Sequence, residues 1–135
     1  GFGLLRTVPP CLLDGSHNPH GMRATAQSLQ VRFPQQKFTC RISVMADKDV
    51  TGILTPILPL AKEFVTVRAN LPRAMPAEEL AARITALGGT AQAAPSISAG
   101  VALALSLAGA NGPLCALGTL YFSADVRQAL VVQTR

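Results

Sequence analysis

Polar side chains that could bind a ligand follow a short apolar run near the start of the chain, in residues 12–21, LLDGSHNPHG. The run predicts a buried strand, and the proline at position 19 suits the first turn of a helix. In open α/β sheets ligands bind at the carboxyl ends of strands, where the next helix presents free backbone N–H groups to anions. Asp14 is therefore placed to accept hydrogen bonds from ribose hydroxyls. The same pattern also fits plain turn and cap roles for Asp14 and Asn18.

His17 and His20 stand three residues apart, a spacing that can bring two side chains to one face of a helix. A metal site would need further ligands, and Asp14 is the one acid nearby. We therefore expect no metal site at these histidines.

A lysine between two acids follows the second apolar run, in residues 45–50, MADKDV. At a strand-to-helix junction Lys48 is placed to meet a carboxylate or a phosphate of a ligand. The alternative is a solvated loop in which Asp47 or Asp49 caps the next helix. Both interpretations are compatible with the sequence.

A third junction, at residues 117–121, LGTLY, places a hydroxyl group in a glycine turn. Gly118 and Thr119 fit an ordinary turn with a capping hydroxyl as well as a ligand contact. Because the carboxyl ends of parallel strands meet at one edge of a sheet, the three junctions are expected to lie together.

Several nucleotide-binding and catalytic motifs are absent from the sequence. The residues before Lys37, Lys48 and Lys62 are glutamine, aspartate and alanine, so no lysine completes a P-loop. A Gly-x-Ser-x-Gly nucleophile elbow and a Gly-x-Gly-x-x-Gly dinucleotide fingerprint are also missing. A self-contained hydrolase or Rossmann oxidoreductase therefore lacks support.

The elements that would position these residues alternate between apolar runs and helical patterns. This alternation predicts βαβ units, and hence an α/β fold with an open, mostly parallel sheet and helices on both faces. Proline at position 56 should end the second helix early. Strands are expected at residues 11–13, 38–44, 64–67, 90–93 and 114–117, and helices at residues 19–29, 50–58, 76–87, 96–107 and 124–132.

Composition limits the function further. The 135 residues suit one domain, and 49% hydrophobic with 14% charged residues suits a packed α/β interior. The twelve Lys and Arg and seven Asp and Glu give a net charge of +5, but the basic residues are scattered and only five Phe and one Tyr are available for stacking. These features argue against a nucleic-acid partner.

The membrane and the compartment can also be addressed from sequence. The most apolar stretch, residues 99–110, falls short of the roughly 20 residues that a membrane-spanning helix needs, so no membrane association is expected. Cys11, Cys40 and Cys115 are odd in number and lie in apolar runs, which favours buried thiols in a reducing compartment. We therefore expect a cytoplasmic protein.

Taken together, the segments resemble the folylpolyglutamate synthase and dihydrofolate synthase branch of the Mur ligase family. Residues 14–19, DGSHNP, are similar to the family's DGAHNP signature, with serine in place of alanine, and residues 46–49 match its ADKD segment. Residues 118–121, GTLY, stand where the family commonly has GSLY. Weaker similarities lie at residues 70–76, NLPRAMP, and 125–127, DVR.

The resemblance implies that residues 1–135 form the carboxy-terminal domain of a two-domain, ATP-dependent ligase. An amino-terminal P-loop domain of the same polypeptide would hold ATP and Mg²⁺. A folate carboxylate would be phosphorylated by ATP, and the amine of L-glutamate would attack the acyl phosphate. The isolated domain would be inactive.

The resemblance also implies roles for individual residues. Asp14 would face the ribose of ATP, and three side chains would gather around the incoming glutamate, namely His17, Lys48 and Thr119. Supporting positions would be Asn18, Asp47 and Gly118.

Two other functions remain open from the sequence. One is the carboxy-terminal domain of a cell-wall Mur ligase, which shares the architecture, although His-Asn-Pro after Asp14 favours the folate branch. The other is a stand-alone module that binds a nucleotide or another anion without a catalytic partner.

Overall fold

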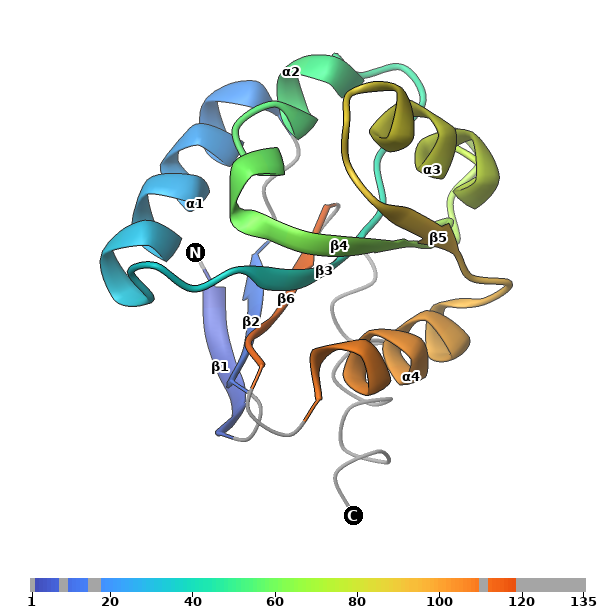
Figure 1. Cartoon of the computed structure of the whole chain (residues 1–135). Coiled ribbons are helices and arrows are strands. Elements are labelled where there is room, and N and C mark those ends of the chain that lie inside the picture. The colour runs from blue at the N-terminus through green and yellow to red at the C-terminus, as the bar shows by residue number, and fades with distance from the viewer. Residues whose placement is uncertain (1, 8–9, 15–17, 110–111, 119–135) are drawn as a thin grey trace.

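The computed structural model describes residues 2–7, 10–14, 18–109 and 112–118, and their strands form one sheet (Figure 1). The strand order across it is β1-β2-β6-β3-β4-β5. β1 pairs antiparallel with β2, and every other pairing is parallel. The predicted open, mostly parallel sheet is therefore confirmed. The strands are β1 (Phe2–Thr7), β2 (Pro10–Asp14), β3 (Phe38–Ile42), β4 (Ala61–Thr66), β5 (Ala91–Ala93) and β6 (Leu114–Leu117).

β1 was missing from the sequence prediction. It joins β2 through a short connection with no helix between them, so it lies outside the strand-helix alternation that identified the other strands. As an antiparallel edge strand it leaves the parallel core of the sheet unchanged.

Helices cover both faces of the sheet, as predicted. Figure 1 shows α1, α2 and α3 on one face and α4 on the other. The bounds are α1 (Pro19–Arg32), α2 (Val50–Leu54), a short 3₁₀ helix η1 (Leu58–Leu60), α3 (Ala77–Ala86) and α4 (Ile97–Ala108). Pro56 separates α2 from η1, which confirms the predicted early end. The helix predicted at residues 124–132 lies outside the described residues.

Three helices begin with a side-chain cap that satisfies a free backbone N–H group. Asn18 accepts from Gly21 N at 2.7 Å, and Asp49 accepts from Gly52 N at 3.0 Å. Ser96 accepts from Ala99 N at 3.0 Å. Such caps fix where a helix starts, and so fix the loop between each strand and its helix.

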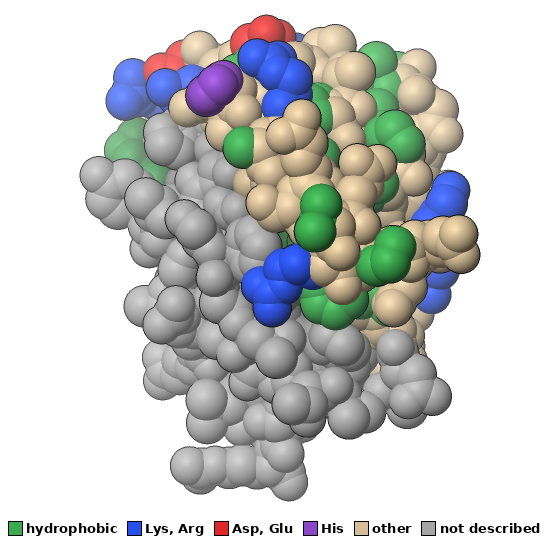
Figure 2. All heavy atoms as spheres, turned by 90° about the vertical axis from the view of Figure 1, so that its left-hand side faces the viewer, with side chains coloured by type: hydrophobic (Ala, Val, Ile, Leu, Met, Phe, Trp, Pro, Cys, Tyr) green, Lys and Arg blue, Asp and Glu red, His purple; other side chains and the backbone are tan. Residues whose placement is uncertain are grey.

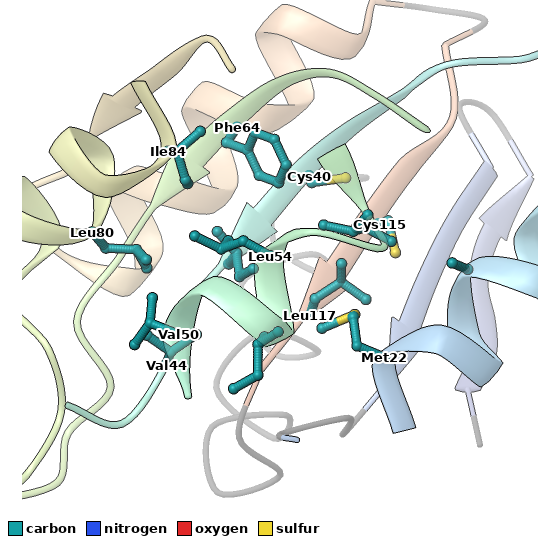
Figure 3. Packing of buried hydrophobic residues seen from close by; sticks show 14 of the residues in the cluster. Met22, Cys40, Val44, Val50, Leu54, Phe64, Leu80, Ile84, Cys115 and Leu117 are labelled. Atoms are coloured by element: carbon teal, nitrogen blue, oxygen red, sulfur yellow. The ribbon is translucent and has the colours of Figure 1, made fainter. Parts of the chain in front are cut away.

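The sheet separates two apolar clusters because successive side chains of a strand point to opposite faces. On the α1–α3 face, Met22, Leu54 and Leu80 from the three helices converge with Phe64 and Leu117 from the strands (Figure 3). The α4 face holds the second cluster, whose fully buried members include Val65, Val67 and Ala104. No helix in the described ranges is long and apolar enough to cross a bilayer.

Candidate functional site

The strand ends identified from sequence lie side by side at one edge of the sheet. Leu13 is the register partner of Ala116, and Ile42 is the partner of Leu117, so β2, β6 and β3 end at the same level. Neighbouring strands are about 4.8 Å apart. The chain segments that leave these three strands therefore start within roughly 10 Å of one another.

The first junction runs from β2 to α1. Asp14 is the last residue of β2, and Asn18 caps α1, with Pro19 in the first turn. The cap role expected for Asn18 is thus confirmed, while the ligand role of Asp14 stays a prediction. His20 is exposed in the first turn of α1, and His17 lies outside the described residues.

The second junction carries Lys48 on an exposed turn, which is closed by a 3.3 Å hydrogen bond from Lys48 N to Met45 O. Each flanking acid is bound elsewhere: Asp49 caps α2, and Asp47 pairs with Arg73. The capping role predicted for one of the two acids therefore belongs to Asp49. Among the described residues no carboxylate pairs with the Lys48 ammonium, which suits it to meet a ligand anion.

The loop between β4 and α3 holds this second junction in place. Ala46 N donates to Arg73 O at 2.7 Å, and Met75 N donates to Val44 O at 2.9 Å. The Arg73 side chain adds a hydrogen bond from Nη1 to Asp47 Oδ2 at 2.8 Å. Sequence reasoning missed Arg73, because no helical or strand spacing links residues 26 positions apart. The only signal was its place in the 70–76 segment.

The third junction begins at Gly118, directly after β6. Its φ is +125°, and a Cβ there would lie 2.9 Å from Ser43 Oγ and still closer to Ser43 O. Ser43 is buried and donates from its backbone N to Leu117 O at 3.3 Å. Glycine is therefore required where β6 leaves the sheet against the end of β3. Thr119 follows it and lies outside the described residues.

Charged side chains gather where α1 and α2 begin. Figure 2 shows lysine or arginine, acidic and histidine side chains along the upper edge of the face turned to the viewer. Arg23, Asp47, Lys48 and Asp49 are all exposed. Asp49 caps α2 and Asp47 pairs with Arg73, so neither described acid neutralises the exposed ammonium of Lys48. This edge can therefore bind an anionic ligand through its cations.

Comparison with known proteins places the chain in a family. Residues 4–120 match the family model described as Mur ligase, glutamate ligase domain. The dihydrofolate synthase/folylpolyglutamate synthase of Mycobacterium tuberculosis is 38% identical over 77 residues, covering 57% of this chain and 16% of the relative. The enzyme of the same name from Bacillus subtilis is 26% identical over 129 residues, covering 94% of this chain and 29% of the relative.

The fold agrees with a solved structure of such a protein. Mycobacterium tuberculosis folylpolyglutamate synthase complexed with ADP superimposes with a TM-score of 0.80 at 27% identity, covering 98% of this chain and 31% of that one. The chain thus spans less than a third of the length of these relatives. The family match runs from within β1 to beyond the end of β6, and the chain belongs to the Mur ligase, glutamate ligase domain family.

Proposed function

We propose that the chain is the glutamate- and nucleotide-contacting, carboxy-terminal domain of an ATP-dependent ligase that adds glutamate to folates. The main support for this proposal is the shared edge at which β2, β6 and β3 end. Lys48 is exposed at this edge, and no described carboxylate neutralises it. Relatives from two bacteria bear the names of both folate ligase activities, which supports the folate branch over the cell-wall branch.

Each junction has a proposed task in binding. The ammonium of Lys48 binds a carboxylate of glutamate, and His17 and Thr119 complete that subsite. Asp14 accepts hydrogen bonds from the ribose of ATP. The supporting residues shape the backbone: Asn18 starts α1, and Gly118 allows β6 to leave the sheet beside β3.

The phosphates of ATP and the metal are assigned to another domain. The sequence has no P-loop, and the described residues include no group of three His, Cys, Asp or Glu placed to hold a metal ion. We propose that an amino-terminal P-loop domain of the same polypeptide holds the triphosphate and Mg²⁺, which neutralises developing phosphate charge. The present domain contributes by positioning the glutamate amine. In well-oriented reactions such positioning is equivalent to an effective concentration of about 10⁵ M or more.

The cytoplasm is the proposed compartment. Cys40 and Cys115 are register partners on adjacent strands, and both side chains are fully buried. Buried reduced thiols are typical of compartments where glutathione and thioredoxin keep cysteines reduced.

The direct test is turnover by the full-length polypeptide that contains this chain. We expect ADP release that requires both a folate and glutamate, together with a product heavier by one glutamyl residue. The isolated 135-residue chain, as the matched control, should show no turnover. Turnover with a nucleotide-linked muramyl substrate in place of folate would support the cell-wall alternative. Nucleotide binding without turnover of either substrate would support a stand-alone binding module.

A further inference from the structure

We propose that Arg73 is a positioning residue of the glutamate subsite, acting by keeping the Asp47 carboxylate away from Lys48. This inference rests on the proposed function, and it adds Arg73 to the residues that favour glutamate binding. It starts from the contacts between two loops, one leaving β3 and the other leaving β4.

The backbones of these two loops pair outside the main sheet. Met45 and Ala74 form an isolated antiparallel bridge, flanked by the hydrogen bonds from Ala46 N to Arg73 O and from Met75 N to Val44 O. These bonds hold the loop that carries Lys48 whatever side chain stands at position 73. The backbone contacts and the side-chain contact of Arg73 can therefore be separated by substitution.

The side-chain contact is an exposed ion pair. Arg73 Nη1 lies 2.8 Å from Asp47 Oδ2, with side chains that are 74% and 44% exposed. Exposed pairs of this kind contribute little to folding stability. Any strong effect of removing Arg73 would therefore be local and electrostatic.

The local effect follows from the sequence. Asp47 is the residue directly before Lys48, so a carboxylate released from Arg73 becomes an uncompensated negative charge next to the ammonium. That charge would pair with Lys48 or repel an incoming carboxylate. Arg73, on the β4–α3 loop 26 positions further along the chain, prevents both by pairing with Asp47.

The test is a pair of single variants and their double variant in the full-length polypeptide. We expect Arg73→Ala to raise the KM for glutamate up to about fivefold, the limit for an exposed ion pair between the released Asp47 carboxylate and Lys48, while kcat and the KM for ATP stay nearly unchanged. Asp47→Asn alone should raise the glutamate KM less than Arg73→Ala does, because it removes the Asp47 carboxylate instead of releasing it beside Lys48. Arg73→Ala combined with Asp47→Asn should restore it, because the released carboxylate is gone. Arg83→Ala is the matched control, since it removes an exposed arginine from the end of α3 without touching the junction.

The outcomes separate the inference from the function on which it rests. No glutamate-dependent turnover by the wild type overturns the proposed function. Turnover by the wild type with an unchanged glutamate KM in Arg73→Ala overturns the inference alone. A raised KM that Asp47→Asn fails to restore also overturns it, because a merely structural role of Arg73 would not be reversed by neutralising its partner.

Discussion

Gly52 faces Pro19 so closely that a Cβ at position 52 would lie 2.9 Å from Pro19 Cγ. This contact joins the first turn of α2 to the first turn of α1. The helix that follows Asp14 and the helix that follows Lys48 are thereby packed at their starts. Two junctions of the candidate site are held in a fixed relation by a residue that carries no side chain.

Gly52→Ala should destabilise the domain although alanine is the better helix former. The added Cβ would displace the Asp49 cap, worth about 0.5–2 kcal/mol, and press on Pro19 at an overpacking cost of about 1–3 kcal/mol. The gain in helix propensity is about 0.5–1 kcal/mol. We expect a net loss of roughly 0.5–4.5 kcal/mol, measured by urea unfolding. Thr51→Ala, at an exposed neighbour, is the control, and equal stability of the two variants would contradict the steric argument.

Thr66→Val should weaken the link between the end of β4 and the start of α3. Thr66 is fully buried, and its Oγ1 donates to Ala77 O at 2.7 Å. Valine keeps the shape but removes the donor, so the variant should lose about 1 kcal/mol in a denaturant titration. The same change at the exposed Thr90 serves as a control with a near-zero effect. A stability equal to wild type would mean that the buried hydrogen bond makes no net contribution.

Asp14→Ala in the full-length polypeptide should affect ATP more than glutamate. Asp14 ends β2, level with the exits of β6 and β3, where a nucleotide ribose would meet the sheet edge. Hydrogen bonds to a charged group are worth about 1.5–3 kcal/mol, so we expect kcat/KM for ATP to fall tenfold or more. Steady-state kinetics with each substrate varied in turn would measure this. Unchanged ATP parameters would leave Asp14 with only a turn role.

The parallel part of the fold was predictable because its signals are local. Each buried strand is a short apolar run, and each cap stands next to the helix that it starts, as with Asn18 and Asp49. Strand-helix alternation then leaves few topologies, because crossovers are right-handed. β1 was missed for the same reason, since no helix separates it from β2.

The candidate site was predictable only in part. The topology places three strand ends at one edge of the sheet. That these strands end side by side depends on the strand register, which pairs Leu13 with Ala116 and Ile42 with Leu117.

The partner of Asp47 could not be predicted from the sequence either. An acid beside a lysine in the sequence suggests an ion pair between them. In the structure Asp47 pairs with Arg73 instead, because the β4–α3 loop folds back over the junction.

Lys48→Ala separates binding from stability at the second junction. The side chain is exposed, and both neighbouring acids are engaged elsewhere, so its removal should change the free energy of unfolding by no more than about 0.5 kcal/mol. A charge-assisted contact to the carboxylate of glutamate would be worth about 1.5–3 kcal/mol. The gap between these values makes the variant informative.

We therefore expect Lys48→Ala to raise the KM for glutamate tenfold or more in the full-length polypeptide, with the KM for ATP and the thermal midpoint nearly unchanged. Lys37→Ala is the matched control, because Lys37 is also exposed but stands before β3, at the opposite end of that strand from Lys48. If ATP and glutamate constants rise together, Lys48 meets a phosphate rather than the amino acid. If the glutamate constant stays at the wild-type value, Lys48 does not belong to the glutamate subsite, and the exposed ammonium beside the end of β3 is only a solvated loop residue.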